Sequence, residues 1–318
     1  MQRILSCAAL LFAPAIAAAS CGAAFCSVNT SWDAHGGWLE PGARLDLRYE
    51  HIRQDQPRAG RRNIGVGEVP RHHDEQLTLN RNLLATLDYT FNQDWGLNLL
   101  VPIIDRQHDH IHNHRGAPLD ESWDFTRVGD VRVMARRRLH SSEDHESHRL
   151  ATSAVNVGLK LPTGQTNVRN AAGDLAERSL QPGSGTTDLV AGANYSVALP
   201  MSSLSWFVQG LAQLPLAEKD DYRAGSRLNL DLGARYDVGD RVGLLLQFNA
   251  LFRARDHGAD AEPEDTGGRF LFLSPGVSYA FTRQWQAYAF VQMPLYQDVN
   301  GVQLVARHAL AVGINTRF

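Results

Sequence analysis

The sequence predicts an all-β protein: a single transmembrane antiparallel β-barrel of about twelve strands. Three observations carry this prediction, namely alternating apolar and polar residues in twelve segments, connections that alternate in length, and a leader typical of exported proteins. The 318 residues are 43% apolar and 20% charged. No apolar run reaches the ~18 residues of a spanning helix. A formal net charge of -3 gives no concentrated basic face, so no nucleic-acid partner is expected.

The first 42 residues divide into a leader and a short segment before the first strand. Residues 1–19 combine the positive Arg3, an apolar stretch and a small-residue cleavage site, which predicts a signal peptide. Residues 20–42 are expected to form a periplasmic segment that carries Cys21 and Cys26. In an oxidising envelope compartment this close pair predicts a small-loop disulfide. A redox or metal pair and a lipidated Cys21 are the alternatives.

Residues 43–318 form the predicted barrel. Side chains alternate between the two faces of a strand, so a period of two gives each strand one apolar face. Leu83, Leu87 and Tyr89, for example, alternate with Asn82 and Asp88. The expected strands lie near residues 44–50, 82–91, 95–103, 131–136, 155–161, 189–199, 206–216, 228–236, 242–252, 273–281, 285–293 and 304–318.

The connections indicate that the apolar face meets lipid. Short links at 92–94, 199–203, 238–241 and 282–284 alternate with long polar links near 54–76, 105–123, 162–185, 217–226 and 254–268. Outer-membrane barrels have short periplasmic turns and long external loops, whereas a soluble sandwich has no reason to gather its long loops at one end. The sequence therefore predicts the outer membrane of a Gram-negative bacterium as location and its lipid bilayer as partner.

Aromatic residues near the expected strand ends agree with this location. They include Trp95, Trp206, Tyr236, Tyr279 and Trp285, which suit the interfacial girdles of a barrel. The terminal Phe318 on an alternating last strand resembles the signal read by the outer-membrane assembly machinery, which is the second expected partner.

The polar face of each strand is expected to line the lumen. The charged members of this set are Asp46, Arg48, Glu50, Asp88, Arg132, Arg136, Lys160, Asp231, Arg235 and Arg307. Buried charges persist only if water or opposite charges satisfy them. Two interpretations follow: a water-filled pore for a small solute, or a lumen closed by its own salt bridges. Arg137 and His308 share the parity of the lipid-facing residues; Arg137 can snorkel near its strand end.

Histidines are concentrated in two of the expected external loops. His108, His110, His112 and His114 alternate within ten residues, and His72 and His73 lie in the preceding loop. Imidazole suits Zn or Cu, so these six residues predict a metal site. Same-face neighbours on a strand are about 6.5 Å apart, so a site would need a bend or the approach of His72 and His73. The alternative is a polar, pH-sensitive loop without metal. No other cofactor is expected.

No catalytic motif is present. A Gly-x-Ser-x-Gly elbow is missing, and Gly183-Ser-Gly185 lies in a loop before a strand. Phosphate-binding and dinucleotide-binding loops are also missing. The sequence therefore predicts that the protein is not an enzyme.

Four motifs resemble a known family. Val128-Gly-Asp-Val-Arg-Val133, Gly158-Leu-Lys-Leu-Pro-Thr-Gly164, Gly183-Ser-Gly-Thr-Thr-Asp188 and Ser274-Pro-Gly-Val-Ser-Tyr-Ala-Phe281 are similar to motifs of outer-membrane barrels described as transporters of the phenol-degradation (meta-pathway) group. The resemblance covers roughly residues 80–318. It implies an outer-membrane channel for small aromatic or other hydrophobic compounds. No functional residues carry over, because the motifs are interpreted as turns and strands.

Three functions are thus compatible with the sequence. The first is a channel for passive passage of a small solute. The second is a metal-related outer-membrane protein that uses its external histidines. The third is a closed barrel that serves as a structural or partner-binding scaffold, with residues 20–42 as its periplasmic contact.

Overall fold

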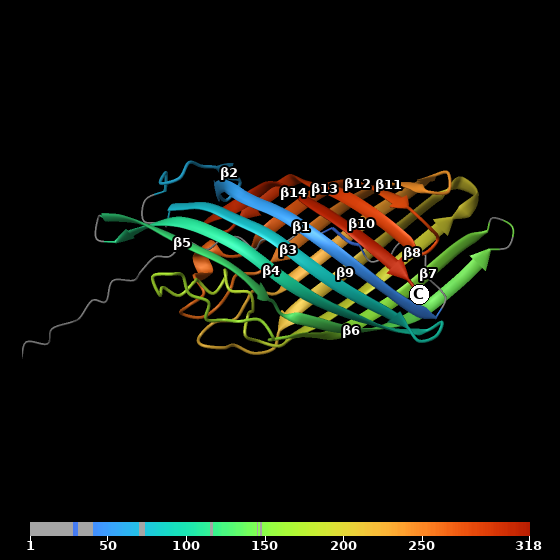
Figure 1. The fold of residues 1–318 in the computed structure, drawn as a ribbon, viewed down its shortest axis with the longest axis horizontal. Helices are drawn as coiled ribbons and strands as arrows, with labels where there is room; N and C mark the ends of the chain where they lie inside the picture. The colour runs from blue at the N-terminus through green and yellow to red at the C-terminus, as the bar shows by residue number, and fades with distance from the viewer. Residues whose placement is uncertain (1–27, 31–40, 70–73, 115–116, 145, 147) are drawn as a thin grey trace, which may run out of the picture.

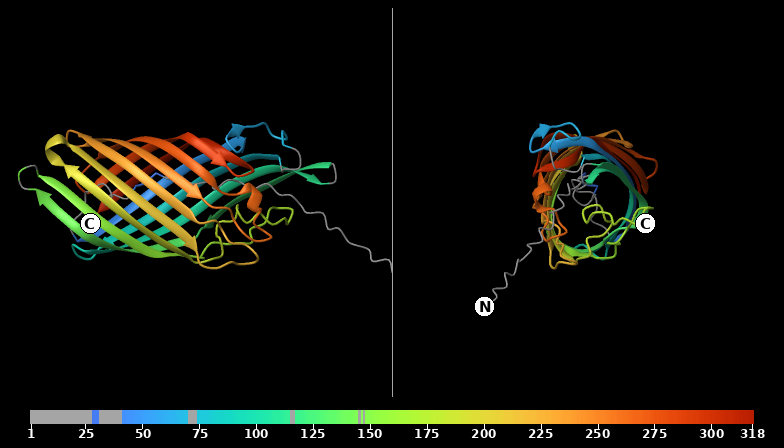
Figure 2. Two further views of the ribbon diagram at one scale, coloured as in Figure 1. Left: turned by 180° about the vertical axis from the view of Figure 1, so that it is seen from behind. Right: turned by 90° about the vertical axis from the view of Figure 1, so that its left-hand side faces the viewer.

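The chain closes into a barrel. A computed structural model describes residues 28–30, 41–69, 74–114, 117–144, 146 and 148–318. These residues form one antiparallel sheet whose first strand pairs with its last (Figures 1 and 2). β1 (Gly42–Ala59) is in register with β14 (Val302–Arg317) over most of their length. The described residues include no helix that is long and apolar enough to cross a membrane.

Twelve strands make the barrel wall, which confirms the predicted fold class. Each pairs with the wall strand that follows it in the chain, so the sheet is an up-and-down meander. β2 (Arg62–Asn63) is a two-residue addition to β1. The other strands are β3 (Asp74–Thr90), β4 (Trp95–His114), β5 (Ala117–Val128), β6 (Val131–Asp144), β7 (Arg149–Leu161), β8 (Asp188–Leu199), β9 (Leu204–Pro215), β10 (Arg227–Val238), β11 (Val242–Arg253), β12 (Gly268–Ala280) and β13 (Trp285–Val299).

One wall strand is interrupted. Residues 95–100 of β4 pair with β6, whereas residues 103–114 pair with β5. Gly129 and Asp130 separate β5 from β6, so these two strands are pieces of one wall strand. Within the described chain, β5 pairs with no strand except β4. The far edge of β5 therefore faces the connection 162–187, and not another strand.

Of two stretches expected as external loops, one is largely strand and the other is partly strand. β4 continues through the His-rich segment to His114 and β5 begins at Ala117, where a loop over 105–123 was predicted. β1 likewise runs to Ala59 and β3 begins at Asp74, so the connection is shorter than the predicted 54–76. Main-chain hydrogen bonds can continue between two strands whatever side chains the strands carry. The alternation of apolar and polar residues, however, is present only where one face of the strand is apolar. The polar outer ends of these strands were therefore predicted as loops.

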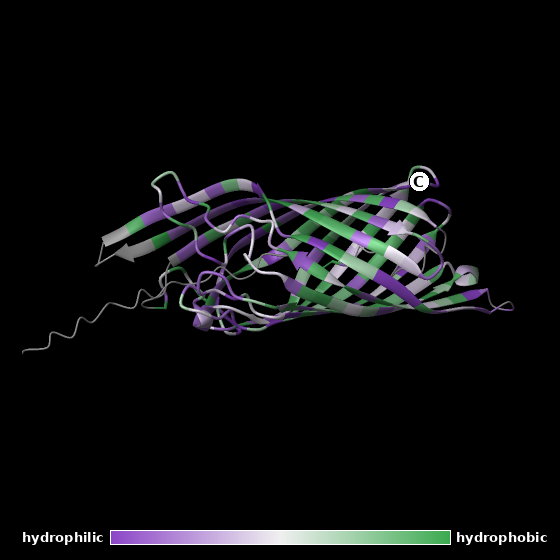
Figure 3. Cartoon of the chain, turned by 90° about the horizontal axis from the view of Figure 1, so that it is seen from below, coloured by the Kyte–Doolittle hydropathy of each residue, from purple (hydrophilic) through white to green (hydrophobic). Residues whose placement is uncertain are grey.

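The outer surface of the barrel is apolar. Leu230 in β10 is 43% exposed and Leu244 in β11 is 50% exposed, whereas the inward Asp231 and Gln247 beside them are buried. Figure 3 shows apolar residues recurring along the barrel strands, while the long connections are mostly polar. This arrangement gives the barrel a lipid-facing belt.

Arg137 is accommodated at the edge of this belt. Its guanidinium carbon lies 5.1 Å from the ring centroid of Trp95, to which it is paired across β4 and β6. A cation over an indole face is favourable, and both side chains suit the membrane interface.

A bulge in β14 changes the parity that the sequence predicted there. Ile52 pairs with Ala309 and Gln54 with Ala306, so Arg307 and His308 together oppose a single residue of β1. Both side chains are exposed. The guanidinium of Arg307 is 3.6 Å from Asp55, which also binds the outward Arg53. The prediction that Arg307 lines the lumen is therefore wrong, because the extra residue turns it to the outer face.

The belt predicts a depth-dependent effect of charge. Leu232→Arg, near the middle of β10, is expected to lower the free energy of unfolding by about 2–4 kcal/mol, because the guanidinium must leave water for hydrocarbon. Leu216→Arg, just beyond the end of β9, is the matched control and should cost about 0–1 kcal/mol. Urea unfolding in lipid vesicles measures both. Equal losses at the two positions would contradict the assignment of the belt.

Candidate functional site

The barrel encloses a polar cavity at its centre. Its volume is about 210 Å³. Six of the predicted lumen residues line it: Asp46, Arg48, Asp88, Arg132, Arg136 and Asp231. Glu50 and Lys160 are buried elsewhere in the lumen, and Arg235 lines a second cavity of about 840 Å³ beside the short turns at 200–203 and 282–284.

Ion pairs organise one side of the central cavity. The guanidinium of Arg44 lies 3.3 Å from Asp46 and 3.0 Å from Asp88. Asp46 also accepts a hydrogen bond of 2.9 Å from the hydroxyl of Tyr288. Arg48 lies 3.2 Å from Glu50. Each of these buried charges thus lies beside an opposite charge, which offsets the cost of removing it from water.

The segment Val28–Thr30 lies inside the barrel. The side-chain amide of Gln247 holds the backbone of Asn29 through both groups, accepting from its N–H at 3.0 Å and donating to its carbonyl at 2.8 Å. Arg48 donates to the carbonyl of Val28 at 3.1 Å, and Arg44 donates to that of Thr30 at 3.0 Å. Part of the predicted periplasmic segment 20–42 is thus in the lumen, because its main chain matches polar groups there. Cys21, Cys26 and the predicted signal peptide 1–19 lie outside the described residues.

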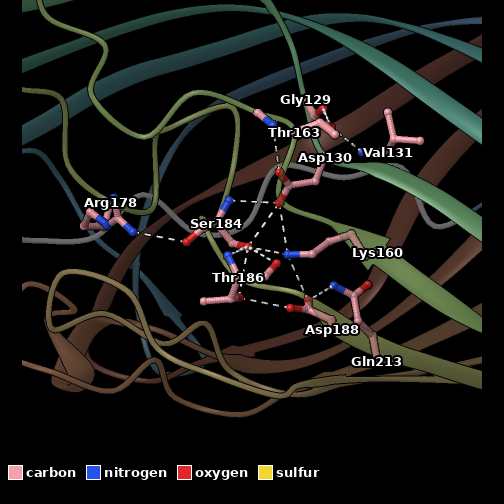
Figure 4. A network of polar contacts seen from close by, with 11 residues as sticks. Gly129, Asp130, Val131, Lys160, Thr163, Arg178, Ser184, Thr186, Asp188 and Gln213 are labelled. Carbon is pink, nitrogen blue, oxygen red and sulfur yellow. Dashed lines mark hydrogen bonds and ion pairs between the residues drawn. The ribbon is translucent and has the colours of Figure 1, made fainter.

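Three of the four sequence motifs meet at the interruption of the wall (Figure 4). The carboxylate of Asp130 accepts hydrogen bonds from the amides of Gly164 and Ser184 at 3.0 and 2.9 Å, and from the Ser184 hydroxyl at 3.0 Å. Lys160 lies 3.0 Å from Asp130 and 3.1 Å from Asp188. We call Asp130, Lys160, Gly164, Ser184 and Asp188 the Asp130 network. Sequence reasoning interpreted these motifs as turns and strands only and missed that they converge.

The Asp130 network requires close packing of two glycines. A Cβ on Gly164 would lie 2.6 Å from the Cα of Gly183, and one on Gly183 would lie 2.4 Å from the Gly164 carbonyl oxygen. Neither position has room for a side chain. The two ends of the connection 162–187 are therefore held against each other beside Asp130.

Lys160 ties the two carboxylates of the Asp130 network together. It hydrogen-bonds to the Ser184 hydroxyl and also pairs with the carboxylates of Asp130 and Asp188. The geometry is that of a structural clamp.

An apolar cluster completes the closure beside β5. Trp123 and Phe125 of β5 pack with Val168, Ala176 and Leu180 of the connection 162–187. The indole N–H of Trp123 donates to the carbonyl of Asp174 at 3.1 Å. The connection thus covers the edge of β5 that has no strand neighbour.

The external loops also interlock with one another. Arg178 of the connection 162–187 lies over the ring of Tyr222, 4.9 Å from its centroid. Tyr222 donates to Asp256 at 3.0 Å, and Arg253 binds the same carboxylate through two contacts of 2.8 Å. Three connections, 162–187, 216–226 and 254–267, therefore form one polar cap.

Carboxyl groups meet where two of these connections approach. Burial raises the pKa of Glu177, and the nearby charges of Glu121 and Asp265 raise it further. Burial likewise raises the pKa of Glu262, with added repulsion from Glu177 and Asp265. The packed arrangement of the cap therefore favours protonated carboxyl groups.

Two histidines of the predicted metal site, His108 and His110, lie among the described residues and form a hydrogen-bonded chain. His108 Nδ1 is 2.9 Å from the Thr78 hydroxyl, and its Nε2 is 3.1 Å from His110 Nδ1. His110 Nε2 is in turn 3.1 Å from Glu121. All four ring nitrogens are engaged within the protein, which leaves none directed at a metal in this arrangement.

The other four histidines of that prediction lie in parts of the chain that the structure does not describe: His72 and His73 are outside the described residues, as are the side chains of His112 and His114. In the described part of the chain, no three His, Cys, Asp or Glu side chains are grouped so that they could hold a metal ion.

A closed barrel with an apolar outer face and a charged interior defines an integral β-barrel protein of the Gram-negative outer membrane. The model of one family, described as "Putative MetA-pathway of phenol degradation", matches residues 82–301. Because the match spans more than half of the chain, this protein belongs to that family, as the motifs predicted.

Several solved structures are similar to this chain. The COG4313 outer membrane channel from Pseudomonas putida F1 is similar with a TM-score of 0.66 and 14% identity, covering 92% of this chain and 100% of that one. The NanC porin has a TM-score of 0.44 and 9% identity, covering 86% of this chain and 100% of the porin. The translocator domain of the autotransporter NalP from Neisseria meningitidis has a TM-score of 0.43 and 10% identity, covering 90% and 91% of the two chains. No curated protein sequence matches this chain.

The Asp130 network predicts a local destabilisation. Asp130→Ala removes the acceptor of three hydrogen bonds and leaves the buried Lys160 with one carboxylate. Breaking a buried pair typically costs about 3–5 kcal/mol. Trypsin should therefore cleave after Arg178 much faster in the variant, while the barrel remains folded. Asp174→Ala, an exposed position in the same connection, is the control and should cleave like the wild type. Equal cleavage of all three proteins would contradict the clamp.

The carboxyl pKa values predict a pH dependence of the cap. A carboxyl with a raised pKa in the packed state contributes stability below its ordinary value of 4.5, and that contribution is lost as the pH rises toward the raised value. Nicking of the connection 254–267 by proteinase K, corrected for enzyme activity, should increase at least about tenfold from pH 6 to pH 9. Glu262→Gln should reduce this increase, and the exposed Glu264→Gln should not. An unchanged response in Glu262→Gln would contradict the argument.

Proposed function

We propose that this protein is an outer-membrane channel for the passive passage of a small solute with an apolar or aromatic body. The observation that carries the proposal is the composition of the central cavity. Charged and amide side chains share its lining with Leu100, Met134 and Leu211. A solute with one polar group and an apolar body would contact both kinds of surface. Membership of a phenol-degradation family supports the same class of solute.

The segment Val28–Thr30 is the natural obstacle in this channel. It lines the central cavity and is fixed by Gln247 on one side and by Arg44 and Arg48 on the other. Passage would require this segment to shift, so the rate of opening would depend on how firmly its main chain is held.

A structural scaffold is the second candidate, and a specific observation favours it. The same segment and the ion pairs of Arg44 and Arg48 fill part of the lumen. A barrel that never opens would support a scaffold, so conductance separates the two functions.

The test is single-channel recording of the mature protein in planar bilayers. The wild type is expected to show brief openings. Gln247→Ala removes two hydrogen bonds to Asn29, each worth about 1 kcal/mol, so the open fraction should rise about tenfold or more. Gln286→Ala, in the cavity beside the short turns, is the control and should behave like the wild type. A correctly folded barrel that never conducts, even as Gln247→Ala, would overturn the proposal in favour of the scaffold.

A further inference from the structure

Arg132 is a cation of the central cavity that forms no ion pair with the described residues. It belongs to β6, opposite Leu100 of β4 and Lys160 of β7, and it lines the cavity. Its Nε is buried and has no hydrogen-bond partner in the described part of the chain. A guanidinium has five N–H donors and no acceptor, so such a side chain needs an anion or polar oxygens.

The anions near Arg132 are already engaged. Asp88 is the carboxylate whose charge acts on Arg132, but it is held by Arg44 at 3.0 Å and by the amide of Asn98 at 2.6 Å. Arg48, a nearby cation, pairs with Glu50. Among the described residues, no carboxylate therefore contacts Arg132 directly.

A further arginine strengthens the positive field of this wall. Arg136 of the same strand donates to the Thr90 hydroxyl at 2.8 Å and also lines the cavity. Gly96 makes room for it, because a Cβ there would lie 2.7 Å from the Arg136 guanidinium. Among the residues that line the cavity, four arginines stand against three carboxylates, and Asp231 lies across the barrel on β10.

The rest of the cavity lining suits both the carboxylate and the apolar body of a small organic acid. Asn98, Asn156 and Asn194 offer amide groups that can donate to a carboxylate oxygen. Leu100, Met134 and Leu211 offer an apolar surface close by in the same cavity. A volume of about 210 Å³ restricts the occupant to a small molecule, since drug-sized ligands take about 300–1,000 Å³.

We propose that Arg132 is the centre of a binding site for the carboxylate of a small aromatic or aliphatic monocarboxylic acid. Its planar guanidinium matches the two oxygens of a carboxylate, while Arg48 and Arg136 add positive potential. This inference rests on the proposed channel and deepens it, because it gives the solute a defined charged group. The site would hold the acid at mid-barrel, beside Val28–Thr30.

The test is isothermal titration calorimetry of the full mature protein, refolded in detergent at low chloride, with benzoate as the probe. Arg132→Gln is expected to weaken benzoate binding about tenfold or more, because a hydrogen bond to a charged group is worth about 1.5–3 kcal/mol. Benzyl alcohol, which lacks the charge, should bind more weakly than benzoate and be unaffected by the substitution. Arg307→Gln removes an equal charge from the outer face and should bind benzoate like the wild type.

A conservative substitution of Arg132 distinguishes loss of the binding site from loss of the folded barrel. Arg132→Lys keeps the charge without the two-pronged geometry and should give an affinity between those of the wild type and Arg132→Gln. Equal benzoate affinity in the wild type and Arg132→Gln, or no benzoate binding by the folded wild type, would overturn the site. Bilayer conductance is recorded in parallel. Benzoate binding without any openings would reject the channel and keep the site, whereas openings without benzoate binding would reject the site alone.

Discussion

The structure depends on one constraint: the free edge of a strand must be covered, because its main-chain N–H and C=O groups otherwise stay open to pairing with another chain. Within the described chain, β5 has such an edge, since it pairs only with β4. There the connection 162–187 covers the edge. The Asp130 network fixes both ends of that connection, and the cluster around Trp123 packs its middle against β5. Closure of the wall beside β5 and placement of the external cap both follow from this clamp.

The charged lumen follows from the same requirement that polar groups have partners. A lipid-facing belt directs most polar residues of the membrane-spanning strands inward, where opposite charges and the main chain of Val28–Thr30 satisfy many of them. The pairing is uneven, since arginines outnumber carboxylates around the central cavity. In the proposed channel, this excess would favour the anionic group of a solute, and the apolar residues beside it would contact the body of that solute. The proposed function thus depends on how the interior charges are balanced.

Much of the fold could be predicted from the sequence, because alternation reports which strand faces meet lipid. All twelve predicted strands coincide with wall strands. The alternation fades where strands leave the membrane, so β5 and the outer half of β4 were predicted as a loop. The parity of Arg307 failed for a different reason: a bulge adds one residue, and nothing in the local pattern marks it.

The candidate site was less predictable, because it joins residues that are far apart in the chain. Asp130 and Ser184 are 54 positions apart, and only the barrel brings them together. The family motifs that contain these two residues were the available signal, and they were interpreted as turns and strands. The histidine pattern was visible, but whether ring nitrogens bind metal or each other depends on side-chain geometry. The entry of Val28–Thr30 into the lumen likewise depends on Gln247, more than 200 residues away.

The most direct test of the account is hydrogen–deuterium exchange of the wild type in lipid vesicles, resolved for peptides within the connection 162–187. If the Asp130 network closes the wall, peptides that contain Gly164 and Ser184 should exchange almost as slowly as the barrel strands. The exposed stretch around Ala172 should exchange much faster. Uniformly rapid exchange across the whole connection would show that the wall beside β5 is not held closed, and would contradict the account.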